Sequence, residues 1–151
     1  MSAPSEKKSK EIKIETKHVV KPEDIVKNER IMKLLLIMDI YGDISEKGLI
    51  NLVYELKEQG YDLGYSFFKI GDTITSKQLR EDMLSLLYVD FVETIGRAKK
   101  LRVTGFGREA LTKASLSEEE RSKIKSLIDK IRPKIASIDA EVELFHTARR
   151  R

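Results

Sequence analysis

The chain contains no cysteine, and this absence excludes several kinds of chemistry at once. Disulfides, thiolate zinc sites and cysteine nucleophiles all need that residue, and its absence fits a reducing compartment. Histidine is nearly as rare, because His18 and His146 are the two in the sequence and each stands alone. No carboxylate has a histidine, a metal-ligand spacing or a phosphate-binding glycine loop beside it. We therefore predict that the protein is not an enzyme and carries no metal or cofactor.

Long hydrophobic runs are missing as well. The longest apolar run, residues 34–38, is far shorter than the roughly 20 residues of a membrane-spanning helix. Residues 1–17 contain no apolar stretch of signal-peptide length. The sequence therefore predicts a cytoplasmic protein with no membrane partner, associated with the nucleoid if it binds DNA.

Charge is plentiful but nearly balanced. Charged residues make up 36% of the chain, and 29 basic against 25 acidic residues leave a formal net charge of +4. With so small a net charge, affinity for nucleic acid depends on where the basic residues lie. Asn and Gln are scarce beside abundant Lys, Glu and Ile. This bias is reported for proteins of hot environments and indicates a thermophilic, archaeal source.

The first 21 residues alternate Lys and Glu with few apolar side chains. Such a segment buries too little surface to offset the entropy of ordering it, so we predict a flexible charged arm over residues 1–21. Ile12, Ile14 and Thr16 alternate with charged residues as a short edge strand does. A solubilising tail is the interpretation we favour.

Two helices are expected next. The first starts at Pro22 or at Asn28, since both residue types are common at helix starts, and it ends at Gly42. It is apolar around much of its circumference, which predicts a central core helix. The second covers residues 46–59, with Ser45 as its cap and one clean apolar face.

The third helix follows an unusually long connection. Residues 60–75 carry glycines around an aromatic stretch, which favours a short strand within a loop. Thr75 and Gln78 have the spacing of a capping box, and apolar residues at helical spacing then continue to Tyr88.

A β-hairpin follows the third helix. Residues 91–94 and 101–104 are two short β-favouring runs, joined by a basic, glycine-containing turn over residues 95–100. Thr104 is placed to cap another helix. The expected order is therefore helix, helix, helix, hairpin, helix.

The last segment has a heptad pattern. Ser117 and Glu120 form a second capping box, which opens the last helix. Pro133 lies inside this helix and predicts that it kinks or restarts there. The apolar residues of this segment are spaced alternately by four and three, as in a coiled-coil seam. They are Ile124, Ile128, Ile131, Ile135, Ile138, Val142 and Phe145.

Residues 101–111 resemble the wing-exit signature of MarR-like and PadR-like regulators. In that family the second wing strand ends in a Thr, a Gly follows three residues later, and an apolar residue lies on the next helix turn; here these are Thr104, Gly107 and Leu111. Residues 42–45 are similar to the family's first strand and helix cap. The resemblance covers residues 28–113. It implies a mainly α (α+β) fold, a winged helix-turn-helix with a small β-hairpin wing and a C-terminal helical dimerisation extension.

Three segments are therefore expected: the arm over 1–21, a winged-helix domain over 22–114 and a dimerisation segment over 115–151. The resemblance implies that the third helix enters the major groove of DNA while the wing touches phosphates. Four basic residues lie in and beside the hairpin turn with no acid among them, which suits counterion release; a merely solvated turn is the alternative. These wing residues are Arg97, Lys99, Lys100 and Arg102.

Base contacts would come from the start of the third helix, at Ser76, Lys77, Gln78 and Arg80. Alternatively Gln78 closes the capping box, while Lys77 and Arg80 pair with nearby acids. The long connection over residues 60–75 departs from the family, in which three or four residues join these helices. This long connection either changes the shape of the DNA-reading surface or makes that surface a protein-binding one.

The aromatic residues of that connection have two interpretations. They stack on bases or anchor a protein partner through residues 61–68, or half of them pack on the core, which is the interpretation we favour. They are Tyr61, Tyr65, Phe67 and Phe68.

The heptad seam must be buried somewhere. Its partner is either the same helix of a second subunit, which we favour as a homodimer, or the chain's own domain. The basic residues Arg149, Arg150 and Arg151 suit a helix carboxyl end and only secondarily a DNA contact.

The leading functional hypothesis is a dimeric winged-helix protein that binds double-stranded DNA, either a transcriptional regulator or a less selective chromatin-associated factor. The alternative is a winged-helix protein–protein interaction module in a transcription, replication or segregation assembly.

Overall fold

The computed structural model describes residues 21–114 and 116–149. In these residues it has six helices and two two-stranded antiparallel sheets, so the mainly helical α+β prediction is confirmed at that level. None of the described helices is long and apolar enough to cross a membrane. The arm predicted over residues 1–21 lies outside the described residues except for Lys21, and Arg150 and Arg151 lie outside them too.

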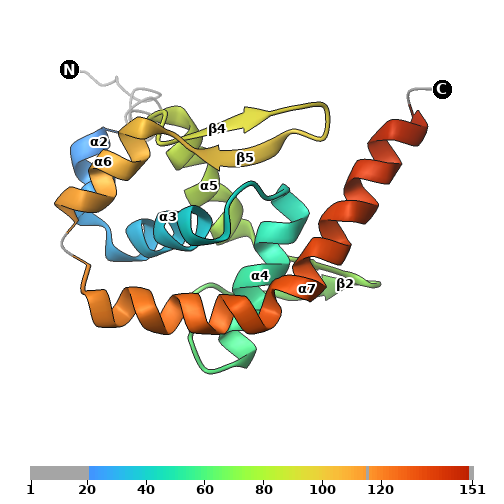
Figure 1. Cartoon of the computed structure of the whole chain (residues 1–151), viewed down its shortest axis with the longest axis horizontal. Coiled ribbons are helices and arrows are strands. Elements are labelled where there is room, and N and C mark those ends of the chain that lie inside the picture. Colours follow the sequence, from blue (N-terminus) through green and yellow to red (C-terminus); the bar gives the residue numbers. More distant parts are fainter. Residues whose placement is uncertain (1–20, 115, 150–151) are drawn as a thin grey trace, which may run out of the picture.

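The elements follow the expected order, with one hairpin and one short helix more than predicted (Figure 1). The single helix expected from Pro22 or Asn28 is two helices, one starting at each position. The helices are α2 (Pro22–Lys27), α3 (Glu29–Tyr41), α4 (Glu46–Glu58), α5 (Lys77–Tyr88), α6 (Gly105–Lys113) and α7 (Glu118–Arg149). The strands are β2 (Phe68–Ile70), β3 (Thr73–Thr75), β4 (Val92–Ile95) and β5 (Lys100–Val103).

The hairpin β4–β5 is tied to the segment before α4. Its register pairs Val92 with Val103 and Ile95 with Lys100. Ile44 forms an isolated antiparallel bridge to Leu101, with N–O distances of 3.2 and 2.7 Å between their backbones. The base of the hairpin is thereby joined to the segment that leads into α4.

A second hairpin, β2–β3, fills the long connection before α5. Phe68 pairs with Thr75 and Ile70 with Thr73. The sequence predicts one strand here, whereas the structure has two, each only three residues long. The exposed face of this hairpin carries Phe68 and Ile70, since residues two apart share a face.

Most helix starts are capped as predicted, with one correction. Asn28, Ser45 and Thr104 accept hydrogen bonds from backbone amides three residues later. At α5, however, the capping residue is Ser76, whose Oγ accepts from Leu79 N at 3.3 Å. The predicted Thr75 capping box is therefore wrong by one residue.

The core contains the first part of α7 as well as α3 and α4. Figure 1 shows this part of α7 running along α3 and α4, on the side of the molecule away from the β4–β5 hairpin. Four members of the heptad seam are almost fully buried there: Ile124, Ile128, Ile131 and Ile135. Their assignment to a dimer interface is wrong, because these side chains already pack on the chain's own core.

Pro133 lies inside α7, which continues as one helix to Arg149. Figure 1 shows the helix bending midway, so that its last part rises toward the hairpin turn. A proline removes one backbone hydrogen bond from a helix and crowds the preceding turn, which accounts for a bend. The alternative of two separate helices is therefore settled in favour of a bent one.

Candidate nucleic-acid interface

The tip of the β4–β5 hairpin carries two uncompensated cations. Gly96 and Lys99 both have positive φ, at 72° and 54°, which makes the turn tight. The side chains of Arg97 and Lys99 are exposed and have no acidic partner in the described part of the chain. Of the four predicted wing contacts, these two are open to a phosphate.

The other two wing cations are already paired. Arg102 donates two hydrogen bonds to the Asp43 carboxylate, at 3.0 and 2.9 Å, and Lys100 pairs with Glu143 of α7. The hydrogen bond from Arg102 lowers the pKa of Asp43, and the hydrogen bond to Glu143 raises the pKa of Lys100. Residues 95–102 contain no acid, but Glu93 of β4 lies opposite Arg102 in the sheet register, and the fold brings Asp43 and Glu143 to the hairpin from elsewhere.

The start of α5 is less available than predicted. Ser76 is fully buried as the helix cap, so its assignment to DNA contact is wrong. Gln78 is exposed, and its Oε1 accepts from Ser66 N at 3.0 Å instead of closing a capping box. Arg80 pairs with Glu46 at 2.8 Å. Lys77 is exposed and has no ion pair among the described residues.

The outward face of α5 is poorly suited to reading bases. Glu81, Leu84 and Tyr88 are exposed at helical spacing after Lys77, and Leu84 and Tyr88 are 56% and 63% exposed. Base edges are read by donors and acceptors such as Arg, Lys, Asn and Gln. This face has one acid and two large apolar side chains instead.

Three contacts show that the hairpin and the starts of α4 and α5 adjoin one another. Arg80 of α5 reaches Glu46 in the first turn of α4. Ser45, the cap of α4, binds Asp139 of α7, and Glu143 one turn later binds Lys100 at the hairpin. We call this region the wing face: the turn over residues 95–100 and the first turns of α4 and α5.

Asp139 of α7 is a buried acid that contacts the wing face at Ser45. It is 5% exposed, and its Oδ1 accepts from Ser45 Oγ at 2.5 Å and from Ser45 N at 3.3 Å. Gly48 makes this approach possible, since a Cβ there would lie 2.4 Å from Asp139 Oδ1. The sequence shows Asp139 and Glu143 at an i, i+4 spacing, but no local pattern indicates which surface they meet.

The aromatic residues of the long connection are mainly structural. Tyr65 is buried, and its hydroxyl donates to Asp82 Oδ2 at 2.6 Å, while Arg30 donates to the same carboxylate at 2.8 and 3.2 Å. Burial, followed by the hydrogen bond to Asp82, raises the pKa of Tyr65. Tyr61 is buried as well and donates to Glu120 of α7. The core-packing interpretation is confirmed for these two tyrosines.

The rest of that aromatic set lies nearer the surface. Phe67 is half-buried and packs edge-on against Tyr54, with the ring centroids 5.5 Å apart. Phe68 is exposed on the β2–β3 hairpin. A partner contact through residues 61–68 therefore stays a prediction for Phe68 and, in part, for Phe67.

The positive net charge does not come from the described body of the protein. Of the 29 basic and 25 acidic residues, residues 1–20 contain 5 and 3, and Arg150 and Arg151 are two more basic ones. Residues 21–149 therefore hold 22 basic and 22 acidic residues. Any attraction of this body for nucleic acid is local to patches such as the hairpin turn.

No match accompanies this geometry. No family model, curated protein or solved structure matches the chain. The resemblance to MarR-like and PadR-like regulators therefore stays a prediction.

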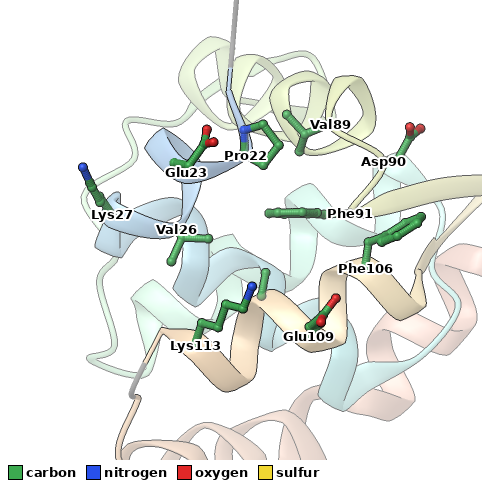
Figure 2. A pocket seen from close by; sticks show the side chains of 11 residues that line it. Pro22, Glu23, Val26, Lys27, Val89, Asp90, Phe91, Phe106, Glu109 and Lys113 are labelled. Carbon is green, nitrogen blue, oxygen red and sulfur yellow. The ribbon is translucent and has the colours of Figure 1, made fainter.

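One groove lies apart from the wing face. It measures about 600 Å³ and runs between α2, α6 and the turn before β4 (Figure 2). Its rim mixes acidic and basic side chains, and it contains none of the predicted DNA or dimer residues. The larger apolar side chains that line it belong to Pro22, Val26, Val89, Phe91 and Phe106.

The described residues offer no obvious site for a metal. Within residues 21–114 and 116–149 no group of three or more His, Cys, Asp or Glu side chains is arranged to hold an ion. Several carboxylates pair with cations instead: Asp39 with Arg108 and Glu55 with Lys134.

Proposed function

We propose that this protein binds duplex DNA through its backbone, with little base selectivity, using the turn of the β4–β5 hairpin as a wing. The observation that carries the proposal is the pair of exposed, unneutralised cations at that turn, Arg97 and Lys99. Two such charges at the tip of a projecting hairpin suit phosphate contact, because neutralising phosphates releases condensed counterions.

The order of the elements supports the same proposal. A winged helix has three helices followed by a two-stranded wing, and a short extended stretch before its second helix pairs with the wing. Here α3, Ile44, α4, α5, β4 and β5 follow that order, with Ile44 bridged to Leu101. The hairpin turn and Lys77 at the start of α5 then face the duplex together.

Weak base selectivity follows from the chemistry of α5. Gln78 and Arg80, which would read bases, are engaged with Ser66 and Glu46. The exposed Leu84 and Tyr88 offer no donor or acceptor pattern that matches the major groove, apart from the tyrosine hydroxyl. Of the two roles expected from the sequence, the less selective chromatin-associated factor is therefore favoured over the transcriptional regulator.

The protein-interaction module is the second candidate, and one observation favours it. Leu84 and Tyr88 form an exposed apolar pair on α5, beside Glu81, and apolar and aromatic side chains are what a protein partner buries. Under this proposal, changing Leu84 and Tyr88 to serine abolishes partner binding, while the charges of the hairpin turn are dispensable.

A homodimer stays a proposal only for the end of the seam. Ile138 and Val142 are half-buried and Phe145 is exposed, whereas the four earlier members are in the core. The mass of the protein in solution, measured over a range of concentrations, tests this.

The deciding experiment is titration of random-sequence duplex DNA at low and moderate salt. Changing Arg97 and Lys99 to alanine should weaken binding and reduce the steepness of its salt dependence by about 1 to 2 in logarithmic slope. The matched control is R121A/K130A, which also removes one Arg and one Lys from the first part of α7, both exposed and without ion pairs to the described residues.

Three outcomes are informative. Weaker binding by R97A/K99A alone supports the proposal, and equal affinities for unrelated duplexes support the lack of selectivity. Equal losses in the two double variants would overturn the role of the hairpin turn. A wild-type protein that does not bind duplex even at low salt would leave the protein-interaction module as the better proposal.

A further inference from the structure

The end of α7 places an acid where a phosphate would otherwise be held. The amino end of a helix attracts anions, because its first N–H groups lack partners and the helix dipole is positive there. At α4 this position is taken by the Asp139 carboxylate, which is bound by both the amide and the hydroxyl of Ser45. A side chain from residue 139 thus supplies the anion from within the same chain.

Residues of α4 and of the β4–β5 hairpin both accommodate acids of α7. On α4 the residue facing Asp139 is Gly48, where any side chain would begin 2.4 Å from Oδ1. On the hairpin side, Lys100 reaches Glu143, which lies one helical turn beyond Asp139. Residues four apart lie on the same side of a helix, so Asp139 and Glu143 both lie toward the wing face.

Glu141 shows that the arrangement is specific to one side of the helix. It lies between the two acids in sequence, is exposed, and has no ion pair among the described residues. The acids at this end of the helix therefore do not all lie on the side toward the hairpin. Asp139 and Glu143 face it, and Glu141 does not contact it.

The end of α7 is also held more weakly than the beginning. After Ile135 the helix has no fully buried apolar side chain among those described, and Leu144 and Phe145 are 69% and 59% exposed. The Lys100–Glu143 pair is part-exposed, and such pairs contribute little because water and salt screen them. Pro133 separates this end from the buried part, at a point where the helix lacks a backbone hydrogen bond.

We propose that residues 138–145 of α7 act as an intramolecular competitor of the DNA backbone on the wing face. Asp139 and Glu143 occupy the amino end of α4 and Lys100, and a bound duplex displaces them, so that phosphates take over the same donors. This inference rests on the proposed DNA binding and adds its regulation. Because salt screens the part-exposed Lys100–Glu143 pair, the effect of Glu143 on affinity is largest at low salt.

The test compares Glu143→Gln with Glu141→Gln in the full-length protein, using random-sequence duplex at low salt. Both variants remove one negative charge from the same end of α7, but only the first frees Lys100. Glu143→Gln should bind duplex roughly 1.5- to 5-fold more tightly than Glu141→Gln, which is the range of an exposed ion pair. Hydrogen exchange of the backbone amides of residues 138–145 is measured in parallel, without and with saturating duplex.

Displacement predicts faster exchange in residues 138–145 of the wild type when duplex is added. Unchanged or slower exchange, or equal affinities of the two variants, overturns the competitor while leaving DNA binding intact. If neither the wild type nor Glu143→Gln binds duplex, the proposed function itself fails. Binding by Glu143→Gln but not by the wild type would support both proposals.

Discussion

The two halves of α7 have the same apolar spacing but opposite surroundings. In residues 118–132 the seam is buried: Ile124 and Ile128 are fully enclosed by the core. Beyond Ile135 the seam members are half-buried or exposed, and in this half two acids, Asp139 and Glu143, contact Ser45 and Lys100. A heptad pattern therefore indicates that a helix has an apolar face, but it does not indicate what covers that face.

The largest expected effect on stability comes from a substitution in the buried half of α7. Ile128→Ala should lower the free energy of unfolding by about 2 to 5 kcal/mol, because it removes a fully enclosed side chain and leaves a cavity. Val142→Ala, in the other half, should cost much less, since Val142 is only half-buried. Chemical denaturation measures both.

The dependence of thermal unfolding on protein concentration distinguishes internal packing of Ile128 from a dimer held by this residue. If Ile128 packs within its own chain, wild type and variant show the same dependence of Tm on protein concentration, whereas a dimer held by this residue makes only the Tm of the wild type depend on concentration. A rise of Tm with concentration that disappears in Ile128→Ala would restore the dimer interface.

The next effect compares one aspartate in each half. Asp139→Ala should cost about 1 to 3 kcal/mol, because it leaves the amide and hydroxyl of Ser45 without their buried acceptor. Asp129→Ala removes an exposed i, i+4 partner of Lys125 and should change stability by less than about 0.5 kcal/mol. Equal losses measured by thermal unfolding would show that Asp139 has no special role.

A smaller effect sharpens the role of Gly48. Alanine normally favours a helix over glycine by about 1 kcal/mol, yet Gly48→Ala should destabilise the protein, since its Cβ would begin 2.4 Å from Asp139 Oδ1. In the Asp139→Ala background this clash is absent, so the same change should cost less or become stabilising. A double-mutant cycle measures the coupling, and additive effects would contradict the geometry.

The smallest effect concerns the first turn of α7 and depends on pH. The hydrogen bond from Tyr61 lowers the pKa of Glu120, with Lys33 contributing less. Because the folded pKa is below the unfolded value of about 4.3, this contribution is present above that pH and is lost as the pH falls through the folded pKa. Glu120→Gln should flatten the acid dependence of unfolding. Glu119→Gln, which changes an exposed residue that forms no ion pair within the described part of the chain, should leave it as in the wild type.

Local sequence patterns predicted most helices and the β4–β5 hairpin. Ser45 and Thr104 cap the helices that they were expected to cap, because capping needs only a hydroxyl and an amide three residues later. The cap of α5 was predicted at Thr75 and lies at Ser76, because both neighbouring residues carry a hydroxyl that can cap a helix.

The candidate site was harder to predict because its contacts are distant in sequence. Arg102 meets Asp43 and Lys100 meets Glu143, and neither acid is near the hairpin in the chain. A basic turn therefore looks more positive in the sequence than in the fold. The buried Tyr65 and Asp82 and the part-exposed Arg30 likewise come from three separate segments, so no local pattern reveals their cluster.

The burial of the first half of α7 also bears on how the chain matures. Synthesis proceeds from the amino end, so α3 and α4 leave the ribosome well before Ile124, Ile128 and Ile135 are available to pack on them. Until then the apolar sides of α3 and α4 that α7 covers stay open to water and to other chains. A nascent chain halted before residue 124 would therefore expose these sides and be a target for chaperones and proteases, although its hairpin had already been synthesised.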